Sequence, residues 1–470
     1  MSWSQLQLQL QLQLQPWPWP WSQSWVLPLS FVVGLTMLAG SENASAQQTR
    51  GEIESPRAPP LVVNDRLEPD TSDEASTWRL QGRAELEIDQ RRNRRLDRDR
   101  NDRRVDVEPL VRLGVTYRAS RHVFGFVETA LRVRHREERR DPTETLAQLL
   151  GSQAYVGLVD LLPDTRVQIG RWLYRDEREW LFDESLDGAL LRLDRDRIEA
   201  DLMAARVNRW RRDLFDAGTR GEPVNFYGLL VRVPVDRRFK IGGYAVVRHD
   251  TTGVAGRQRH LGLRAHGRSG NWTQWTELGI VDGEVGQQRL RGHVLDVGGV
   301  YMLRRHPLRP RLLVGYAFAS GDDDAGDGVD RRYRQTGLQS NEARLEGLVK
   351  RRIYGEAFDP ELSNLRIRSL GIGFAPTPQW SVDLVWHDYR QDKLGPVARA
   401  GIVPRHDGMT GRALGQEVDL IVGYAPKPTI LLTGAIGWFE PAARFRIDRD
   451  QAPNDPGRAL FARVELRVRF

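Results

Sequence analysis

The chain has 470 residues, of which 70 are Lys or Arg and 63 are Asp or Glu, so its net charge is +7, and it contains no cysteine. The lack of cysteine excludes disulfide frameworks, thiolate metal sites and cysteine nucleophiles. The longest apolar run has about 15 residues, whereas a membrane-spanning helix needs roughly 20, so helical membrane spans are excluded as well.

Residues 1–46 are predicted to be a signal peptide. The apolar run at 25–39 is followed by Ala-Ser-Ala before Gln47, which is the small-x-small pattern of a signal-peptidase site. The leader is atypical because no Lys or Arg precedes the apolar run, and a misassigned start codon would explain this equally well. Residues 47–76 are expected to form a flexible periplasmic segment, and residues 77–470 the folded part.

Apolar and polar residues alternate strictly along much of the folded part, which is typical of half-buried β-strands. In segment 460–470, Leu, Ala, Val, Leu, Val and Phe alternate with Phe, Arg, Glu, Arg and Arg, and segment 78–89 follows the same rule. Eighteen strands are predicted, beginning near residues 78, 105, 121, 152, 164, 187, 197, 224, 239, 257, 271, 288, 310, 365, 379, 414, 429 and 459.

The connections between these predicted strands alternate in length. Turns of a few residues alternate with longer charged stretches at 89–104, 135–151, 172–186, 207–223, 250–256, 281–287, 322–364, 391–413 and 439–458. Short turns at one end, long loops at the other and an even strand number are typical of bacterial outer-membrane proteins. The predicted fold is therefore all-β: a transmembrane antiparallel β-barrel of 18 strands with short periplasmic turns and long extracellular loops, in the outer membrane of a Gram-negative bacterium.

Aromatic residues near the predicted strand ends fit the lipid–water interface of such a barrel. They are Trp78, Tyr117, Trp380, Tyr424, Trp438 and Phe470. Phe470 also ends an alternating strand at the C-terminus, a pattern that looks like the signal read by the outer-membrane assembly machinery. That machinery, outer-membrane lipid and lipopolysaccharide are the expected partners.

A barrel of 16 to 18 strands encloses an aqueous channel, so its function depends on the residues that line the lumen. If the apolar residues face lipid, the inward set includes Arg83, Arg112, Arg132, Arg192, Arg463 and Arg467, with acids such as Glu128 and Glu417 among them. A conduit lined by cations concentrates anions, and guanidinium groups bind carboxylates in a bidentate manner. The pattern favours an anion-selective channel for an acidic polymer, while salt bridges within the wall are the structural alternative for any single arginine.

Other chemistries receive little support from the sequence. The acidic loop 321–330 offers Asp322, Asp324 and Asp327 as a weak calcium candidate, but it lacks EF-hand spacing and a closing Glu. No other cofactor is expected. Nothing arranges the carboxylates or histidines for catalysis, so no enzyme is predicted. No nucleic-acid partner is expected either, because the cations are spread along strands and nearly balanced by acids.

Three segments carry a family resemblance. Residues 170–193 (GRWLYRDEREWLFDESLDGALLRL), 334–341 (RQTGLQSN) and 354–365 (YGEAFDPELSNL) resemble, in this order, three motifs of the alginate-export family of outer-membrane proteins. The resemblance covers essentially the whole mature chain. It implies an 18-stranded barrel with an electropositive constriction, through which an anionic exopolysaccharide such as alginate leaves the periplasm, and it makes a periplasmic polysaccharide-synthesis complex a possible partner.

The same resemblance implies which residues bind the polymer. They are Arg171, Arg175, Arg178, Asp183 and Asp187 in the first motif, and Arg334 and Arg344 in and after the second. Two departures from the family pattern are expected to matter. Trp172 stands where the family usually has Gln, and the turn 425–428 is too short to plug the lumen from the periplasm, so any gating is expected from extracellular loops such as 322–364.

Two alternatives to polymer export stay open. The first is a general anion porin that takes up small acidic solutes or oligosaccharides. The second is a barrel hydrolase or lyase, which would release products from a uronate polymer or a lipid.

Overall fold

The computed structural model describes residues 69, 77–97, 102–139, 141–207, 212–216, 224–251, 256–324, 326–403, 411–443, 447–449, 452–454 and 456–470. The predicted signal peptide lies outside the described residues, and so does the predicted periplasmic segment except for Pro69. No helix in the described part of the chain is long and apolar enough to cross a membrane.

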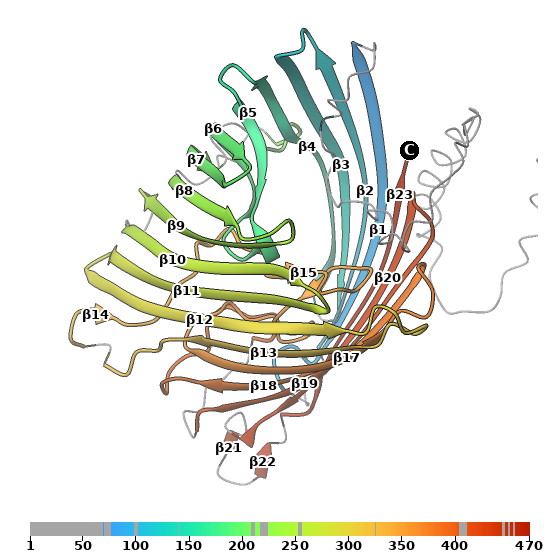
Figure 1. Ribbon diagram of the computed structural model, residues 1–470. Coiled ribbons are helices and arrows are strands. Elements are labelled where there is room, and N and C mark those ends of the chain that lie inside the picture. Colours follow the sequence, from blue (N-terminus) through green and yellow to red (C-terminus); the bar gives the residue numbers. More distant parts are fainter. Residues whose placement is uncertain are drawn as a thin grey trace, which may run out of the picture. The chain divides into compact units, whose positions relative to one another are not determined.

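Eighteen antiparallel strands form the wall of the described chain (Figure 1). They are β1 (Trp78–Arg92), β2 (Arg103–Arg118), β3 (Val123–Glu138), β4 (Asp141–Val159), β5 (Thr165–Arg175), β6 (Asp183–Arg195), β7 (Ile198–Val207), β8 (Val224–Pro234), β9 (Phe239–Asp250), β10 (Gly256–Ser269), β11 (Trp272–Val285), β12 (Gln288–Met302), β13 (Arg311–Ala319), β17 (Leu365–Phe374), β18 (Trp380–Gln391), β19 (Ala413–Lys427), β20 (Ile430–Pro441) and β23 (Ala459–Arg469). The number and order of strands confirm the prediction.

The barrel closes between its first and last strands. β1 pairs with β23 in antiparallel register from Arg83↔Arg469 to Arg92↔Leu460. The backbones of Gly82 and Phe470 exchange two further hydrogen bonds of 2.8 and 2.9 Å. Closure leaves no free sheet edge, so the backbone polar groups of every wall strand can be satisfied within lipid.

A few short elements lie outside this ladder. They are the 3-10 turn η2 (Glu177–Glu179), β14 (Val329–Asp330), β15 (Glu342–Ala343), β16 (Arg351–Arg352), β21 (Ile447–Arg449) and β22 (Ala452–Asn454). β14 pairs in parallel with β12, while β15 pairs with β16 in a two-stranded sheet of their own. In Figure 1, β15 is drawn between the green-yellow and the blue-red parts of the wall.

Two of the predicted long loops are wrong. β3 and β4 extend across most of 135–151, so that only a tight connection remains between Glu138 and Asp141. Similarly, β11 runs to Val285, and the predicted loop 281–287 shrinks to a turn in which Gly286 adopts a φ of 61°. The stretch 135–151 carries polar residues in both phases, whereas at the end of β11 Asp282 and Glu284 follow the outward phase of Ile280, and Val281 is buried on the inner face. Neither stretch shows the alternation with apolar residues outside that marks the other strands.

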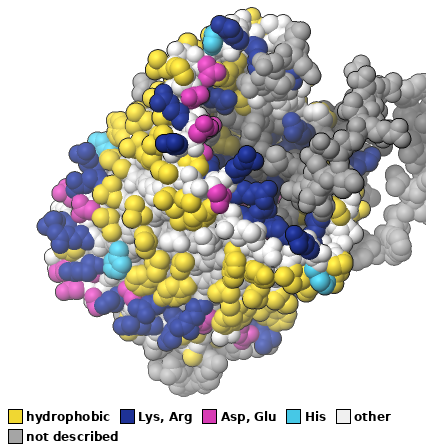
Figure 2. Space-filling view, viewed as in Figure 1, with side chains coloured by type: hydrophobic (Ala, Val, Ile, Leu, Met, Phe, Trp, Pro, Cys, Tyr) yellow, Lys and Arg dark blue, Asp and Glu magenta, His cyan; other side chains and the backbone are white. Residues whose placement is uncertain are grey.

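The outer face of the wall is apolar. Leu80, Leu113, Val127 and Leu263 are among the large hydrophobic residues exposed there, and Figure 2 shows such side chains over much of the visible face, with charged groups toward its rim. At the short-turn end, three tryptophans lie opposite tyrosines on neighbouring strands: Trp78 and Tyr117, Trp272 and Tyr301, and Trp380 and Tyr424, with ring centroids 4.4, 5.0 and 4.2 Å apart. Two of these pairs, Trp78 with Tyr117 and Trp380 with Tyr424, were expected in the interfacial girdle, and Trp272 with Tyr301 extends it.

Candidate functional site

The inner face of the wall carries arginines in ion pairs. Arg112 donates to Glu128 at 3.0 Å and lies 3.5 Å from Glu85, which also pairs with Arg83. Near the chain ends, Arg463 donates to both oxygens of Asp89 at 2.8 and 3.0 Å, and Arg467 pairs with Glu465. The predicted inward phase of these arginines is thus correct, and the predicted structural alternative applies to many of them.

The first motif places its charged residues where β5 turns back into β6. Arg171 donates to both carboxylate oxygens of Asp187 at 2.6 and 2.9 Å and to the carbonyl oxygen of Gly151 at 2.8 Å. Arg175 pairs with Asp183 in the same hairpin. Charge-assisted bidentate pairs of this kind fix geometry as well as energy. They hold the hairpin in register, and whether they also contact a polymer stays a prediction.

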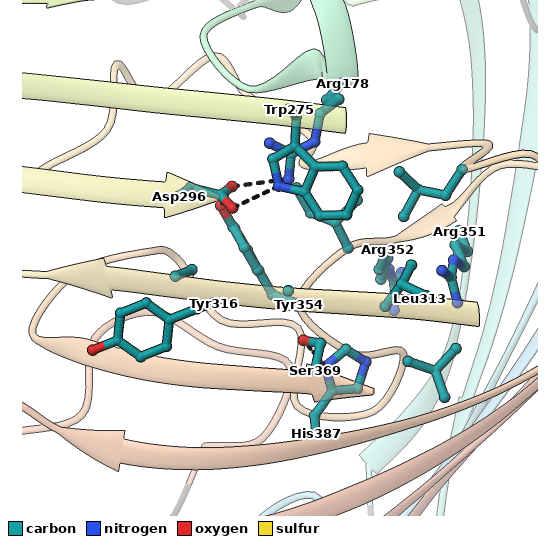
Figure 3. Close-up of a pocket in the computed structure, with 15 residues that line it drawn as sticks. Arg178, Trp275, Asp296, Leu313, Tyr316, Arg351, Arg352, Tyr354, Ser369 and His387 are labelled. Carbon is teal, nitrogen blue, oxygen red and sulfur yellow. Dashed lines mark hydrogen bonds and ion pairs between the residues drawn. The ribbon is translucent and has the colours of Figure 1, made fainter. Parts of the chain in front are cut away.

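Arg178 lies at the tip of this hairpin with an unusual backbone. Its φ of 62° falls in the left-handed region that non-glycine residues rarely adopt. The guanidinium donates to Asp296 at 2.8 Å and stacks over the ring of Trp275 at 4.6 Å. Figure 3 shows Arg178 and Trp275 beside Asp296, while Tyr354 reaches the same carboxylate with its hydroxyl at 2.7 Å. The tip of the β5–β6 hairpin is therefore held by contacts with the wall strands β11 and β12.

Residues 320–364, between β13 and β17, enter the barrel, and we call them the lumen loop. Its described residues reach from the extracellular end to the periplasmic turns: Arg304, in the turn after β12, donates to Glu346 at 2.7 and 2.9 Å. Burial disfavours the charged carboxylate, yet hydrogen bonds from Arg304 and Thr273 hold the pKa of Glu346 below its usual range. The loop expected to act in gating is thus the one that occupies the lumen.

Directly after its tip at 344–347, the lumen loop has an apolar side and a polar side. Leu348 and Val349 pack with Val385, Ile421 and Leu431, an apolar patch on the inner wall. Beside this patch, the backbone N–H of Leu348 donates to the hydroxyl oxygen of Ser381 at 3.0 Å. The loop covers wall residues that a water-filled lumen would otherwise expose, which favours the docked position.

Wall carboxylates hold the ascending part of the lumen loop through its backbone. Glu417 accepts hydrogen bonds from the N–H groups of Ala357 and Phe358 at 2.6 and 2.9 Å. Asp419, two residues along β19, accepts from the N–H of Glu356 at 3.2 Å. These residues belong to the third motif, so its sequence is tied to the anchoring of the loop.

The three sequence motifs meet inside the barrel. Gln335, from the second motif, donates to the carbonyl oxygen of Trp180 at 3.2 Å and accepts from the N–H of Leu362 at 3.0 Å. Trp180, from the first motif, donates through its indole nitrogen to the hydroxyl oxygen of Tyr354 at 2.9 Å. The residues that carry the family resemblance thus build the contact between the β5–β6 hairpin and the lumen loop.

Glu179 occupies the centre of that contact. Its carbonyl oxygen accepts from the N–H groups of Ser340 and Asn341 at 3.2 and 3.0 Å, and its carboxylate binds Ser340 and Lys350. Burial, followed by repulsion from Asp183, raises the pKa of Glu179 to about 7. Sequence reasoning missed this residue; its only signal was a place inside the first motif.

Side-chain exposure divides the lumen arginines into two groups. Arg264 and Arg311 are buried, with side-chain exposures of 1% and 2%, and are enclosed by carboxylates. Arg192 is 41% exposed although it donates to Asp201 at 2.7 Å. Only the second group, to which Arg132 and Arg134 also belong, presents guanidinium surface to a solute.

The remaining predicted residues lie on the lumen loop. Arg334 donates to Asp330 at 2.6 Å and is 32% exposed, whereas Arg344 lies at the loop tip, where its carbonyl oxygen accepts from Gly347 at 2.8 Å. Of the proposed calcium ligands, Asp327 and Asp322 lie 2.6 and 3.5 Å from Arg331, and the described residues contain no cluster of three His, Asp or Glu suited to a metal. Calcium binding stays a prediction without support from these residues.

A closed, antiparallel 18-stranded barrel with an apolar exterior, a charged interior and a long loop in its lumen belongs to the porin-like class of bacterial outer-membrane proteins. The sequence profile described as alginate export matches residues 77–456, and the chain belongs to that family. Family and fold place it in the bacterial outer membrane.

Two relatives and one solved structure illustrate the likeness. The alginate production protein AlgE of Azotobacter vinelandii is 35% identical over 136 residues, covering 27% of this chain and 28% of that protein. AlgE of Pseudomonas aeruginosa is 31% identical over 145 residues, covering 27% and 29%. The matched stretch thus spans less than a third of either relative. The outer-membrane protein OprD of P. aeruginosa shares the fold, with a TM-score of 0.54, 10% identity and coverage of 86% of this chain and 96% of OprD.

Proposed function

We propose that this protein is the outer-membrane channel through which an anionic exopolysaccharide, an alginate-like polyuronate, is exported. Membership of the alginate export family supports the substrate class. The observation that carries the proposal is the group of partly exposed arginines on the inner wall, which offers guanidinium groups to carboxylates.

The acids beside these arginines favour weak, transient binding of a polymer over tight binding. Each exposed arginine already has a carboxylate partner, so a passing uronate carboxylate exchanges one weak pair for another. A conducting site has to bind strongly enough for entry and weakly enough for exit. Exposed ion pairs, worth roughly 0.2–1 kcal/mol each, are in that range.

Planar-bilayer recordings test the proposal. The purified protein is expected to give anion-selective currents that polyuronate reduces and that neutral dextran of equal length does not. Cation selectivity, or equal effects of the two polymers, would overturn it. The uptake alternative predicts permeation of small organic anions without block by long polymer, and polysaccharide-synthase genes next to this one would argue against it.

We also propose that the protein is a channel and not an enzyme, as its family and fold indicate. One arrangement resembles catalytic machinery: the Ser369 hydroxyl lies 2.8 Å from Nδ1 of His387 (Figure 3), and Nε2 of His387 lies 3.4 Å from Asp419. The cavity beside these groups measures about 20 Å³, which is room for about one water molecule and far too small for a saccharide. Incubation with polyuronate or phospholipid, followed by product analysis, is expected to show no cleavage.

We also propose a cleaved signal peptide, two protein partners and a calcium site, each of which has a direct test. Removal of residues 1–46 predicts a mature N-terminus at Gln47, which peptide sequencing can read. The assembly machinery is the proposed partner of the C-terminal strand, so deletion of Phe470 is expected to lower assembly. A periplasmic synthesis complex is the proposed source of the polymer, and co-purification tests it. Calcium at Asp322, Asp324 and Asp327 is tested by calorimetry with Ca²⁺.

A further inference from the structure

The extended ends of β2 and β3 carry a row of arginines on their inner face. Arg132, Arg134 and Arg136 follow one another at every second position of β3, in the same phase as Glu128, which pairs with Arg112 inside the barrel. The Cα atoms of successive residues on one face of a strand lie about 6.8 Å apart. Arg104, on β2, shares an acid with this row and completes a set of four that we call the exit ladder.

The ladder lies at the extracellular end of the wall. β2 starts and β3 ends at the rim opposite the short turns, because the turn between the two strands, 119–122, belongs to the short-turn end. Strands β3 and β4 continue to Glu138 and Asp141. The exit ladder therefore lines the last part of the lumen that an exported polymer passes.

Two carboxylates support these four arginines from behind. Asp106 accepts from Nε of Arg104 and from Nε of Arg136 at 2.6 and 2.8 Å. Glu108 accepts from Nε of Arg134 at 2.6 Å and lies 3.5 Å from Nη1 of Arg132, whose Nε donates to the side-chain oxygen of Gln148 at 3.0 Å. Two more acids approach only to 3.8 Å, beyond hydrogen-bonding distance: Glu138 beside Arg104, and Glu144, itself 65% exposed, beside Arg136.

The anchoring through Nε determines what the ladder can bind. A guanidinium has five N–H donors, and Arg134 and Arg136, which are held at Nε, can turn their terminal nitrogens toward a second carboxylate. Arg104 also binds Asp106 through Nη2 at 3.2 Å, and Arg132 binds Gln148 through Nε and Nη2, so these two offer fewer donors. The four side chains are between 24% and 34% exposed, whereas Arg83 and Arg264 are about 1% exposed. Ligand access thus separates the ladder from the buried ion pairs deeper in the wall.

We propose that Arg104, Arg132, Arg134 and Arg136 form an anion-binding site at the extracellular exit, which holds successive carboxylates of the emerging polymer. The inference rests on the proposed export function and adds to it a second site beyond the lumen loop. Several weak sites in a row keep a flexible polyanion extended and let it advance from one pair to the next.

Side-specific block by a defined oligouronate tests the ladder. In planar bilayers with oriented channels, Arg134→Gln/Arg136→Gln is expected to weaken block from the extracellular chamber about two- to thirtyfold, the range for losing two exposed ion pairs. Block from the periplasmic chamber should change less than twofold. Arg134→Lys/Arg136→Lys keeps the charge but loses the planar fork, so intermediate block is expected.

Arg259→Gln is the matched control, because Arg259 is 56% exposed, pairs with Asp282 and lies in the opposite phase of β10 from the buried Gln258. It should leave block unchanged from either side. Equal extracellular block in the wild type and the Arg134/Arg136 double Gln variant would overturn the ladder while leaving the export proposal intact. A wild-type channel that the oligomer blocks from neither side would overturn the export proposal and the ladder together. If the double variant does not assemble, Arg134→Gln alone is expected to weaken extracellular block as well, by a smaller factor.

Discussion

Replacement of Glu417 by Ala tests whether the lumen loop is held in place by its backbone. Glu417 is fully buried and accepts the N–H groups of Ala357 and Phe358. Truncation leaves these two buried N–H groups without their acceptor, and each such loss costs about 1–3 kcal/mol. The Tyr389 hydroxyl, which also donates to Glu417 at 3.1 Å, keeps the carbonyl oxygen of Tyr354 as an acceptor. Part of this cost is offset because a buried carboxylate disappears with it.

We therefore expect Glu417→Ala to destabilise the docked state of the lumen loop by about 2–3 kcal/mol. Because 1.36 kcal/mol corresponds to a factor of ten, the ratio of undocked to docked loop should rise about 30- to 150-fold. A lumen without its loop conducts more current, so single-channel recordings should show high-conductance bursts that are at least about tenfold more frequent than in the wild type.

Two variants separate loop release from general damage. Glu417→Gln keeps one acceptor oxygen and should give an intermediate burst frequency. Gln416→Ala changes the neighbouring residue of β19, which is exposed on the opposite face, and should leave the currents as they are. If Glu417→Ala gives the burst frequency of Gln416→Ala, Glu417 is not what holds the lumen loop.

Three further predictions concern the charged groups around the loop. Burial raises the pKa of Glu179 from 4.5 to about 7, so the Glu179 carboxyl holds its proton more tightly when the lumen loop is docked. The resulting stabilisation of the docked state is complete below about pH 4.5 and is lost as pH rises through about 7. Glu179→Gln should therefore flatten the pH dependence of burst frequency between about pH 5 and 8. Arg178→Ala removes one partner of a buried ion pair and leaves Asp296 without its cation, at a cost of about 3–5 kcal/mol, so protease should cut the lumen loop of the folded variant faster than that of the wild type. Arg192→Ala should lower the anion-to-cation permeability ratio, measured as a shift of reversal potential, with normal assembly, whereas Arg264→Ala should lower the yield of folded barrel because Asp176 and Glu277 stay buried without it.

The alternation of apolar and polar residues was sufficient to predict the barrel. It works for β1 and β23 because one face of each strand meets lipid and the other meets charged neighbours. It fails at 135–151, where the upper parts of β3 and β4 carry polar residues in both phases. The alternation placed Arg132 and Arg134 on the inner face, but it missed Arg136, which lies in this stretch, and Arg104, which falls in the predicted loop 89–104.

Residue roles were harder to predict than residue faces. The phase of a strand tells that Arg171 points inward, but it does not tell that both oxygens of Asp187 already engage its guanidinium. Similarly, the motif residues Gln335 and Trp180 lie far apart in sequence and meet only through the fold. Pairing and exposure depend on contacts across the lumen, and a single sequence contains no signal for them.

The net charge of +7 therefore says little about selectivity, because the arginines of this lumen serve two purposes. A buried arginine such as Arg311, bound to both oxygens of Asp383 at 2.7 and 2.6 Å, contributes structure, since no solute reaches it. An exposed arginine such as Arg134 contributes to the electrostatic potential at the surface that a solute contacts. If the protein is the proposed anion-conducting channel, its selectivity is expected to depend on a few side chains on β2, β3 and β6, and exchanging these residues should alter conduction far more than an equal change in net charge elsewhere.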